Sequence, residues 1–277
     1  MDAPELLALL TGRRLAVLTG AGISTDSGIP DYRGPDSPPA NPMTIRQFIS
    51  SRDYRRRYWA RNHLGWRHMA ATEPNAGHRA LAELEQAGVV TGVITQNVDL
   101  LHTKAGSRNV INLHGTYAQV VCLKCRQTMT RAALAEMLEA ANPGFTERAE
   151  KVGGLAVAPD ADAVVSDTES FTFIDCPACS GMLKPDIVYF GESVAKEVVD
   201  QAYSLIDESD ALLVAGSSLT VFSGYRFVRH AAAKAMPIAI VNRGPTRGDD
   251  MAAVKLDAGC SPILALLAEE LVSPCLP

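Results

Sequence analysis

The chain has 277 residues, of which 47% are hydrophobic and 21% are charged, and this composition is typical of a folded, water-soluble protein. Its 26 basic and 31 acidic residues give a formal net charge of -5, which disfavours nucleic acid as a ligand. No apolar run approaches the ~18 residues that a membrane span needs, and the first ten residues lack the positive charge of a signal peptide. We therefore expect a cytoplasmic protein with no membrane partner, and we expect it to be a monomer.

Short apolar segments rich in Val, Ile and Leu alternate along the chain with segments of helical periodicity. Such apolar segments are typical of buried parallel strands, and their alternation with helices predicts a Rossmann-like, doubly wound α/β sheet. The predicted strands are 15–19, 89–95, 110–113, 211–215 and 237–241. The predicted helices are 78–86, 195–206, 225–235 and 262–271.

Two segments interrupt this alternation and predict a separate small lobe. Residues 41–72 have helical character with many arginine and aromatic residues, and residues 119–184 contain cysteine pairs. A stretch rich in Gly, Pro and Asp, 142–167, predicts a long loop within the second segment. We therefore expect one domain with a small lobe and a Rossmann-like large lobe. The large lobe comprises residues 1–40, 73–118 and 185–277.

Four of the six cysteines form two Cys-x-x-Cys pairs, Cys122 with Cys125 and Cys176 with Cys179. Four thiolates complete a tetrahedral ligand set for Zn²⁺, which predicts one closed, structural zinc site that takes no part in chemistry. The gap between the pairs exceeds the usual zinc-ribbon gap of about 15 to 20 residues, so we expect additional structure there. A redox pair is the alternative, which two pairs disfavour because redox motifs occur singly.

The first predicted strand runs directly into Gly20-Ala21-Gly22-Ile23-Ser24. Glycines at the end of a strand let the backbone approach a pyrophosphate, although a tight strand-to-helix turn explains them equally well. Thr25 stands where the dehydrogenase pattern has its third glycine, and Ile29-Pro30-Asp31-Tyr32-Arg33-Gly34 follows where a regular helix would run. The segment therefore predicts a phosphate loop of another type than that of a dehydrogenase.

A histidine, His114, comes directly after the predicted strand 110–113. Parallel α/β sheets bind ligands at this end of their strands. An imidazole with a pKa near ~6.5 can accept a proton at neutral pH, so it suits a general base. A structural histidine is the alternative, and the residues alone leave both interpretations open.

Further polar residues follow other predicted strands and reach the same edge of the sheet. Gln96, Asn97 and Asp99 come after strand 89–95, where amides and a carboxylate can bind ribose hydroxyls and a carboxamide or cap a helix. Candidates for the adenosine half of a dinucleotide follow the last two strands and precede the last helix. They are Gly216, Ser217, Ser218, Asn242 and Cys260, of which Cys260 fits a small buried hydrophobic residue equally well.

The motifs of this chain, taken in order, resemble those of the sirtuins, a family of NAD-dependent protein deacylases. The resemblance spans residues 15–271, and its matching segments are 20–24, 28–33, 95–99, 113–115, 184–192, 216–219 and 241–242. Two segments, Phe222-Ser223-Gly224-Tyr225-Arg226-Phe227 and 244–250, are similar to the class II branch of the family.

The resemblance implies that NAD is consumed as a cosubstrate while acyl groups are removed from protein lysine side chains. It implies that the acyl oxygen attacks C1′ of the nicotinamide ribose and that His114 then removes a proton through the ribose hydroxyls. The products are nicotinamide, O-acyl-ADP-ribose and free lysine. Protein mono-ADP-ribosyl transfer is an alternative reaction, and an NAD-sensing binding module is a non-enzymatic alternative, which the presence of His114 disfavours.

The resemblance also implies roles for individual residues. Asn97 acts with His114 in catalysis, Asn97 and Asp99 line the nicotinamide pocket, and Gln96 holds the nicotinamide ribose. The implied NAD contacts are Gly20, Ala21, Gly22, Ser24, Asp31, Tyr32, Arg33, Gln96, Asn97, Asp99, Gly216, Ser217, Ser218, Asn242, Arg243, Gly244 and Cys260.

Residues 184–192 are predicted to form an extended segment after the zinc module. Such a strand can pair with a substrate peptide through its backbone, although an ordinary edge strand is the alternative. The resemblance implies that the acyl-lysine protein or peptide binds here. The implied contacts are Val188, Tyr189, Phe190, Gly191 and Glu192.

The arginine-rich segment contains Tyr58-x-x-Arg61, a form that sirtuins use to hold acidic acyl groups. Arg pairs bidentately with a carboxylate, and Tyr adds a hydroxyl donor. A solvated basic helix face is the alternative. We include Tyr58 and Arg61 among the predicted substrate contacts.

Overall fold

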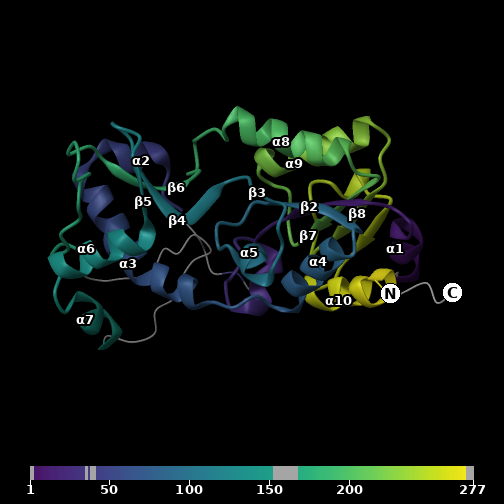
Figure 1. The fold of residues 1–277 in the computed structure, drawn as a ribbon, viewed down its shortest axis with the longest axis horizontal. Coiled ribbons are helices and arrows are strands. Elements are labelled where there is room, and N and C mark those ends of the chain that lie inside the picture. The colour runs from purple at the N-terminus through teal and green to yellow at the C-terminus, as the bar shows by residue number, and fades with distance from the viewer. Residues whose placement is uncertain (1–2, 35–36, 38–41, 152–167, 273–277) are drawn as a thin grey trace.

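The computed structural model describes residues 3–34, 37, 42–151 and 168–272, and Figure 1 shows its elongated shape. A six-stranded sheet with the order β3-β2-β1-β7-β8-β9 lies at one end, and all its neighbouring strands are parallel. Crossovers at both sides of β1 place it near the centre of the sheet. The strands are β1 (Leu15–Thr19), β2 (Val90–Thr95), β3 (Val110–Asn112), β7 (Ala211–Ala215), β8 (Ile238–Val241) and β9 (Val254–Leu256).

Helices cover both faces of this sheet, as Figure 1 shows. On β1, Leu15 and Val17 enter one hydrophobic cluster, while Ala16 and Leu18 enter the cluster on the opposite face. Successive side chains of a strand point to opposite faces, so a strand buried on both faces needs an unbroken apolar run. The first cluster includes α1 (Ala3–Leu10), α4 (Ala76–Gln86) and α10 (Cys260–Val272), and the second includes α8 (Lys196–Asp207) and α9 (Phe222–Ala233).

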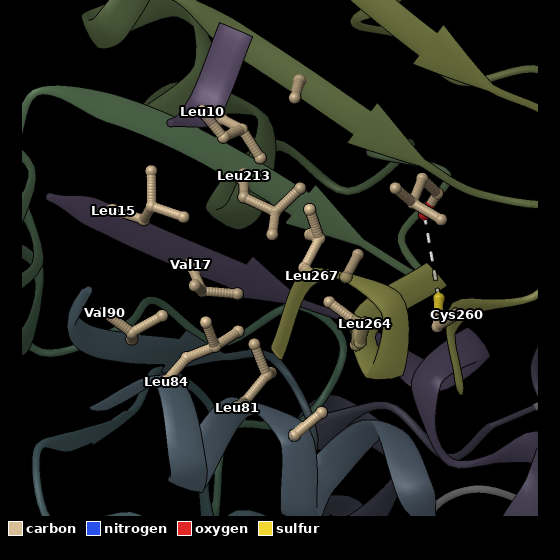
Figure 2. Close-up of a cluster of buried hydrophobic side chains, with 14 of the residues drawn as sticks. Leu10, Leu15, Val17, Leu81, Leu84, Val90, Leu213, Cys260, Leu264 and Leu267 are labelled. Carbon is tan, nitrogen blue, oxygen red and sulfur yellow. Dashed lines mark hydrogen bonds between the residues drawn. The ribbon is translucent and has the colours of Figure 1, made fainter. Parts of the chain in front are cut away.

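Figure 2 shows the first cluster, in which Leu81 and Leu84 of α4 and Leu264 and Leu267 of α10 meet the side chains of β1. Cys260 begins α10 at the border of this cluster, and its thiol lies 3.7 Å from the Val241 carbonyl.

The other end of the molecule holds an antiparallel three-stranded sheet with the order β5-β4-β6. Its strands are β4 (Gly115–Cys122), β5 (Thr128–Thr130) and β6 (Leu183–Ile187). A third hydrophobic cluster joins this sheet to the surrounding helices. These helices are α2 (Ile45–Ser50), α3 (Arg52–Ala71), α6 (Arg131–Ala141) and α7 (Phe145–Lys151). The short α5 (Leu101–Ala105) connects β2 to β3 of the large sheet, and its Leu101 enters the third cluster.

The predicted fold class is confirmed, and the predicted strands 15–19 and 211–215 agree with β1 and β7 at both ends. The predicted long loop 142–167 is wrong in its first part, since α7 lies there, and 152–167 falls outside the described residues. The predicted lobe boundaries at 118 and 184 fall inside β4 and β6. Within the described ranges, no helix combines the length and the hydrophobicity required to cross a bilayer.

Candidate active site

A cavity of about 860 Å³ lies where the loops after β1, β2, β7 and β8 meet. This is the carboxyl edge of the parallel sheet, where the topology places ligand sites. His114 and every predicted NAD contact except Cys260 line it, and so do the predicted peptide contacts Val188, Tyr189, Phe190, Gly191 and Glu192. Residues that are distant in sequence therefore come together as the sequence predicts.

The loops after β1 and β7 touch through their backbones. The Gly22 N–H donates to the Gly216 carbonyl at 2.9 Å, and a Cβ at Gly22 would lie 2.9 Å from the Gly216 Cα. Gly216 has φ +67°, and a Cβ there would lie 2.3 Å from the Ile23 nitrogen. Only glycine permits this approach, so the cavity wall at this point is bare backbone, against which a pyrophosphate can lie.

Replacing Gly22 with Ala is expected to weaken NAD binding by about 5- to 150-fold, because overpacking against backbone costs about 1 to 3 kcal/mol. The added methyl group would push the Gly216 loop out of place. Calorimetric titration with NAD measures the effect, and a thermal unfolding curve shows whether the variant is folded. A folded variant with the wild-type dissociation constant would contradict the assignment of this wall to NAD.

A buried polar network links Ser24, Asn97 and Asp99. The Ser24 hydroxyl donates to Asp99 at 2.7 Å, and the Asn97 amide donates both to Ser24 Oγ and to the Gly20 carbonyl at 3.1 Å. Burial raises the pKa of Asp99, and hydrogen bonds from the Leu101 N–H, Ser24 and Asn97 oppose that shift. The network fixes the Asn97 amide at the cavity wall, where it can orient a polar ligand group.

His114 lies between β3 and β4, and its two ring nitrogens have different partners. Nδ1 lies 2.8 Å from the Gln96 carbonyl, which can only accept, so Nδ1 carries the proton and Nε2 holds the lone pair. Burial lowers the pKa of His114, and the hydrogen bond to Gln96 opposes that shift. The ring is therefore neutral at pH 7 with a fixed tautomer, which is the form that a general base requires.

Gln96 connects the histidine to the strand ends. Its side-chain amide donates to Ser217 Oγ at 2.7 Å and to the Thr19 carbonyl at 3.2 Å. Its backbone carbonyl accepts the hydrogen bond from His114 Nδ1. The first turn of α9 packs so closely here that a Cβ at Gly224 would lie 2.6 Å from Gln96 Oε1.

The start of α9 also lines the cavity and was not among the predicted site residues. Val221, Phe222, Ser223 and Arg226 face it. From the sequence, this segment indicates only the similarity to class II sirtuins. The rule that loops after parallel strands carry the site applies to the connection from β7 to α9, which ends at Val221, and the first turns of α9 continue directly from it.

The segment after β6 is not extended throughout, which corrects the prediction for 184–192. β6 ends at Ile187, and the buried Lys184 then pairs with Glu192 at 3.1 Å while its ammonium group also donates to the Ile187 carbonyl. The chain turns at 189–192, where the Glu192 N–H donates to the Tyr189 carbonyl at 2.9 Å. Val188 donates to the His114 carbonyl at 2.8 Å, so this turn is attached to the histidine.

Tyr58 and Arg61 do not line the cavity as the structure describes it. Tyr58 is 2% exposed, and its ring packs against Phe48, Trp59 and Tyr189. Tyr58 is therefore buried and lies behind the cavity-lining Tyr189, whereas Arg61 is half-buried. The predicted contact of these two residues with an acyl group stays a prediction.

Cys260 lines a smaller neighbouring cavity of about 200 Å³, together with Gly22, Asn242 and Arg243. Burial raises the pKa of its thiol to about 12. Cys260 is therefore an uncharged side chain that is buried in the core and lies beside the glycine loop. This position agrees both with a small buried hydrophobic residue and with a contact to the adenosine half.

The four paired cysteines converge at the end of β4. All four sulfur atoms lie within 4.8 Å of one another, with 3.5 Å between Cys122 and Cys179 and 3.7 Å between Cys125 and Cys176. A disulfide needs about 2.05 Å, whereas ligands of a tetrahedral zinc with Zn–S bonds of about 2.3 Å lie about 3.8 Å apart. The cysteines are positioned to bind one structural Zn²⁺.

The fold and this site together define a sirtuin. The Sir2 family model matches residues 20–223, and the chain belongs to the Sir2 family. It is 76% identical over 270 residues to NAD-dependent protein deacetylase 1 of Mycobacterium avium strain 104, covering 98% of this chain and 96% of the relative. It is 44% identical over 279 residues to the human mitochondrial NAD-dependent protein lipoamidase sirtuin-4, covering 98% and 86%, which supports the class II resemblance.

Solved structures agree with these relatives. A Sir2 complex with a p53 peptide and NAD⁺ has a TM-score of 0.77 at 31% identity and covers 98% of each chain. A Sir2 bound to an acetylated peptide has a TM-score of 0.74 at 29% identity, again with 98% of each chain covered.

Proposed function

We propose that His114 is the general base of this NAD-dependent protein-lysine deacylase and that the glycine loops and the polar network around it bind NAD. The protein removes acyl groups from lysine side chains, and NAD supplies the electrophilic ribose carbon that accepts the acyl oxygen. The observation that carries the assignment of His114 is the fixed tautomer, in which Nδ1–H donates to the backbone carbonyl of Gln96 and the basic lone pair is therefore on Nε2.

We assign the binding of NAD to three groups of residues. The touching backbones at Gly22 and Gly216 fit the pyrophosphate, and Asn242 with Arg243, which follow β8, would contact the adenosine half. Asn97, held by Ser24 and Gly20, orients the nicotinamide end. His114 then takes a proton from a ribose hydroxyl, provided that the hydroxyl comes within about 2.6 to 3.2 Å.

The substrate is an acyl-lysine protein or peptide, and we propose that its backbone lies along residues 188–192. This turn lines the cavity and is anchored to the His114 carbonyl, so it can present the acyl group to the base. We keep the prediction that the enzyme acts as a monomer, without nucleic acid.

Incubation with NAD and a panel of acyl-lysine peptides, followed by mass analysis, tests the function. The expected products are deacylated peptide, nicotinamide and O-acyl-ADP-ribose in equal amounts. A peptide whose mass increases by one ADP-ribose group, with the acyl group retained, would contradict deacylation and favour mono-ADP-ribosyl transfer.

Replacing Arg61 with Met tests the predicted preference for a carboxylate-ended acyl chain. If Arg61 pairs with that carboxylate, the ratio of kcat/KM for glutaryl peptide to that for acetyl peptide should fall by about ten- to a hundredfold, since a charge-assisted hydrogen bond contributes about 1.5 to 3 kcal/mol. Met keeps much of the stem and removes the cation. An unchanged ratio would exclude Arg61 from acyl recognition.

A further inference from the structure

The proton-accepting nitrogen of His114 already has a partner in the free protein. Ser223, the second residue of α9, places its Oγ 2.8 Å from His114 Nε2. The Gln96 carbonyl fixes the proton on Nδ1, so the Ser223 hydroxyl donates and Nε2 accepts. This bond therefore uses the one lone pair that a general base needs.

The position of Ser223 is set by the packing of α9. The neighbouring Gly224 is buried, and its lack of a side chain lets the helix approach to where a Cβ would lie 2.6 Å from Gln96 Oε1. Gln96 in turn holds His114 through its carbonyl. The close contact between Gly224 and Gln96 thus brings Ser223 next to His114. Both Ser223 and His114 line the large cavity.

We propose that Ser223 masks the base until NAD binds. Its hydroxyl occupies Nε2 of the neutral imidazole, and a ribose hydroxyl must replace it there before proton transfer is possible. The proposal rests on the assignment of His114 as the base. On this proposal, NAD must break the hydrogen bond between Ser223 and His114 when it binds, which lowers its net affinity.

Replacing Ser223 with Ala removes the competing donor, so NAD should bind about 2- to 10-fold more tightly, which is the range for the loss of one hydrogen bond. Calorimetric titration of the purified protein with NAD measures this change. KM for NAD should fall in parallel while kcat changes less than about twofold. Ser223→Thr, which keeps the hydroxyl, should retain the wild-type dissociation constant.

Ser204→Ala is the matched control, because it removes a serine hydroxyl from the exposed face of another helix, α8. Its affinity for NAD should be that of the wild type. An unchanged or weaker affinity in Ser223→Ala would overturn the proposal. So would a loss of more than tenfold in kcat, because the hydroxyl would then belong to the path of the proton.

A double-mutant cycle separates this proposal from the proposed function. With His114 replaced by Ala, the serine has no base to mask, so adding Ser223→Ala should leave the NAD dissociation constant unchanged. The same gain in affinity in both backgrounds would overturn the masking of His114. Retained turnover in His114→Ala alone would instead refute the role of the base, whatever the cycle of affinities gives.

Discussion

Replacing His114 with Ala is expected to reduce kcat for deacylation by about 10² to 10⁴-fold, the usual loss when a positioned general base is removed. NAD affinity should stay within about tenfold of the wild type, because backbone at the glycine loops and the Asn97 network carry the binding. Steady-state kinetics on an acetyl-lysine peptide, together with calorimetric titration of NAD, measures the two effects separately.

His230→Ala is the matched control, since this histidine lies on α9 outside the cavity lining and pairs with Asp207. It should leave kcat unchanged. Near wild-type turnover in His114→Ala would exclude this histidine as the base.

The pH profile provides a second measurement on the wild type. Burial disfavours the charged imidazole and lowers the pKa of His114 below 6.5, so the base form persists at pH 6.5 and is lost only as the pH falls through that lowered value. The acid limb of kcat/KM should therefore have its midpoint below 6.5. A midpoint above 6.5 would contradict a buried, neutral base.

Replacing Cys122 or Cys176 with Ser is expected to release zinc and unfold the cysteine-containing end of the molecule. Structural zinc contributes folding free energy of about 10 kcal/mol or more in small modules, which exceeds the net stability of many whole domains. Cys122 and Cys176 are also buried within the third hydrophobic cluster, so the loss of the metal loosens that cluster directly. Metal analysis should find one zinc per chain in the wild type and much less in either variant.

Cys260→Ser is the control for metal content. This cysteine lies outside the four-sulfur group, so the variant should keep one zinc per chain. A zinc-free Cys122→Ser variant with the wild-type melting temperature and activity would refute the structural role of the metal.

The strands of the large sheet could be predicted closely because burial on both faces demands unbroken apolar runs, and these runs end at glycine or polar residues. The same physical signal is absent from β9, which has only three residues, one of them Lys255. The helix α1 is not predicted either, because it has only eight residues and is apolar on most sides, so it shows no helical periodicity.

The residues at the strand ends of the site could be predicted because topology alone brings them to one edge. Contacts that depend on how two elements pack against each other could not be predicted from the sequence. The bond from Ser223 to His114 requires α9 to approach Gln96 over a glycine, and the burial of Tyr58 depends on aromatic partners from α2 and the turn after β6. Likewise, the Lys184–Glu192 pair closes a turn that an extended pattern does not reveal.

The central position of β1 has a consequence for folding during synthesis on the ribosome. Leu15 pairs with Val90 of β2 on one side and with Ala211 of β7 on the other. Because β7 lies about a hundred residues after β3 in the sequence, β1, β2 and β3 are synthesised long before β7. At about 5 to 20 residues per second, the second edge of β1 waits on the order of ten seconds for its partner. During that time an unbroken apolar strand has an open edge, which is the state most prone to pair with another chain. A nascent chain that stalls before residue 211 is therefore a natural client of chaperones.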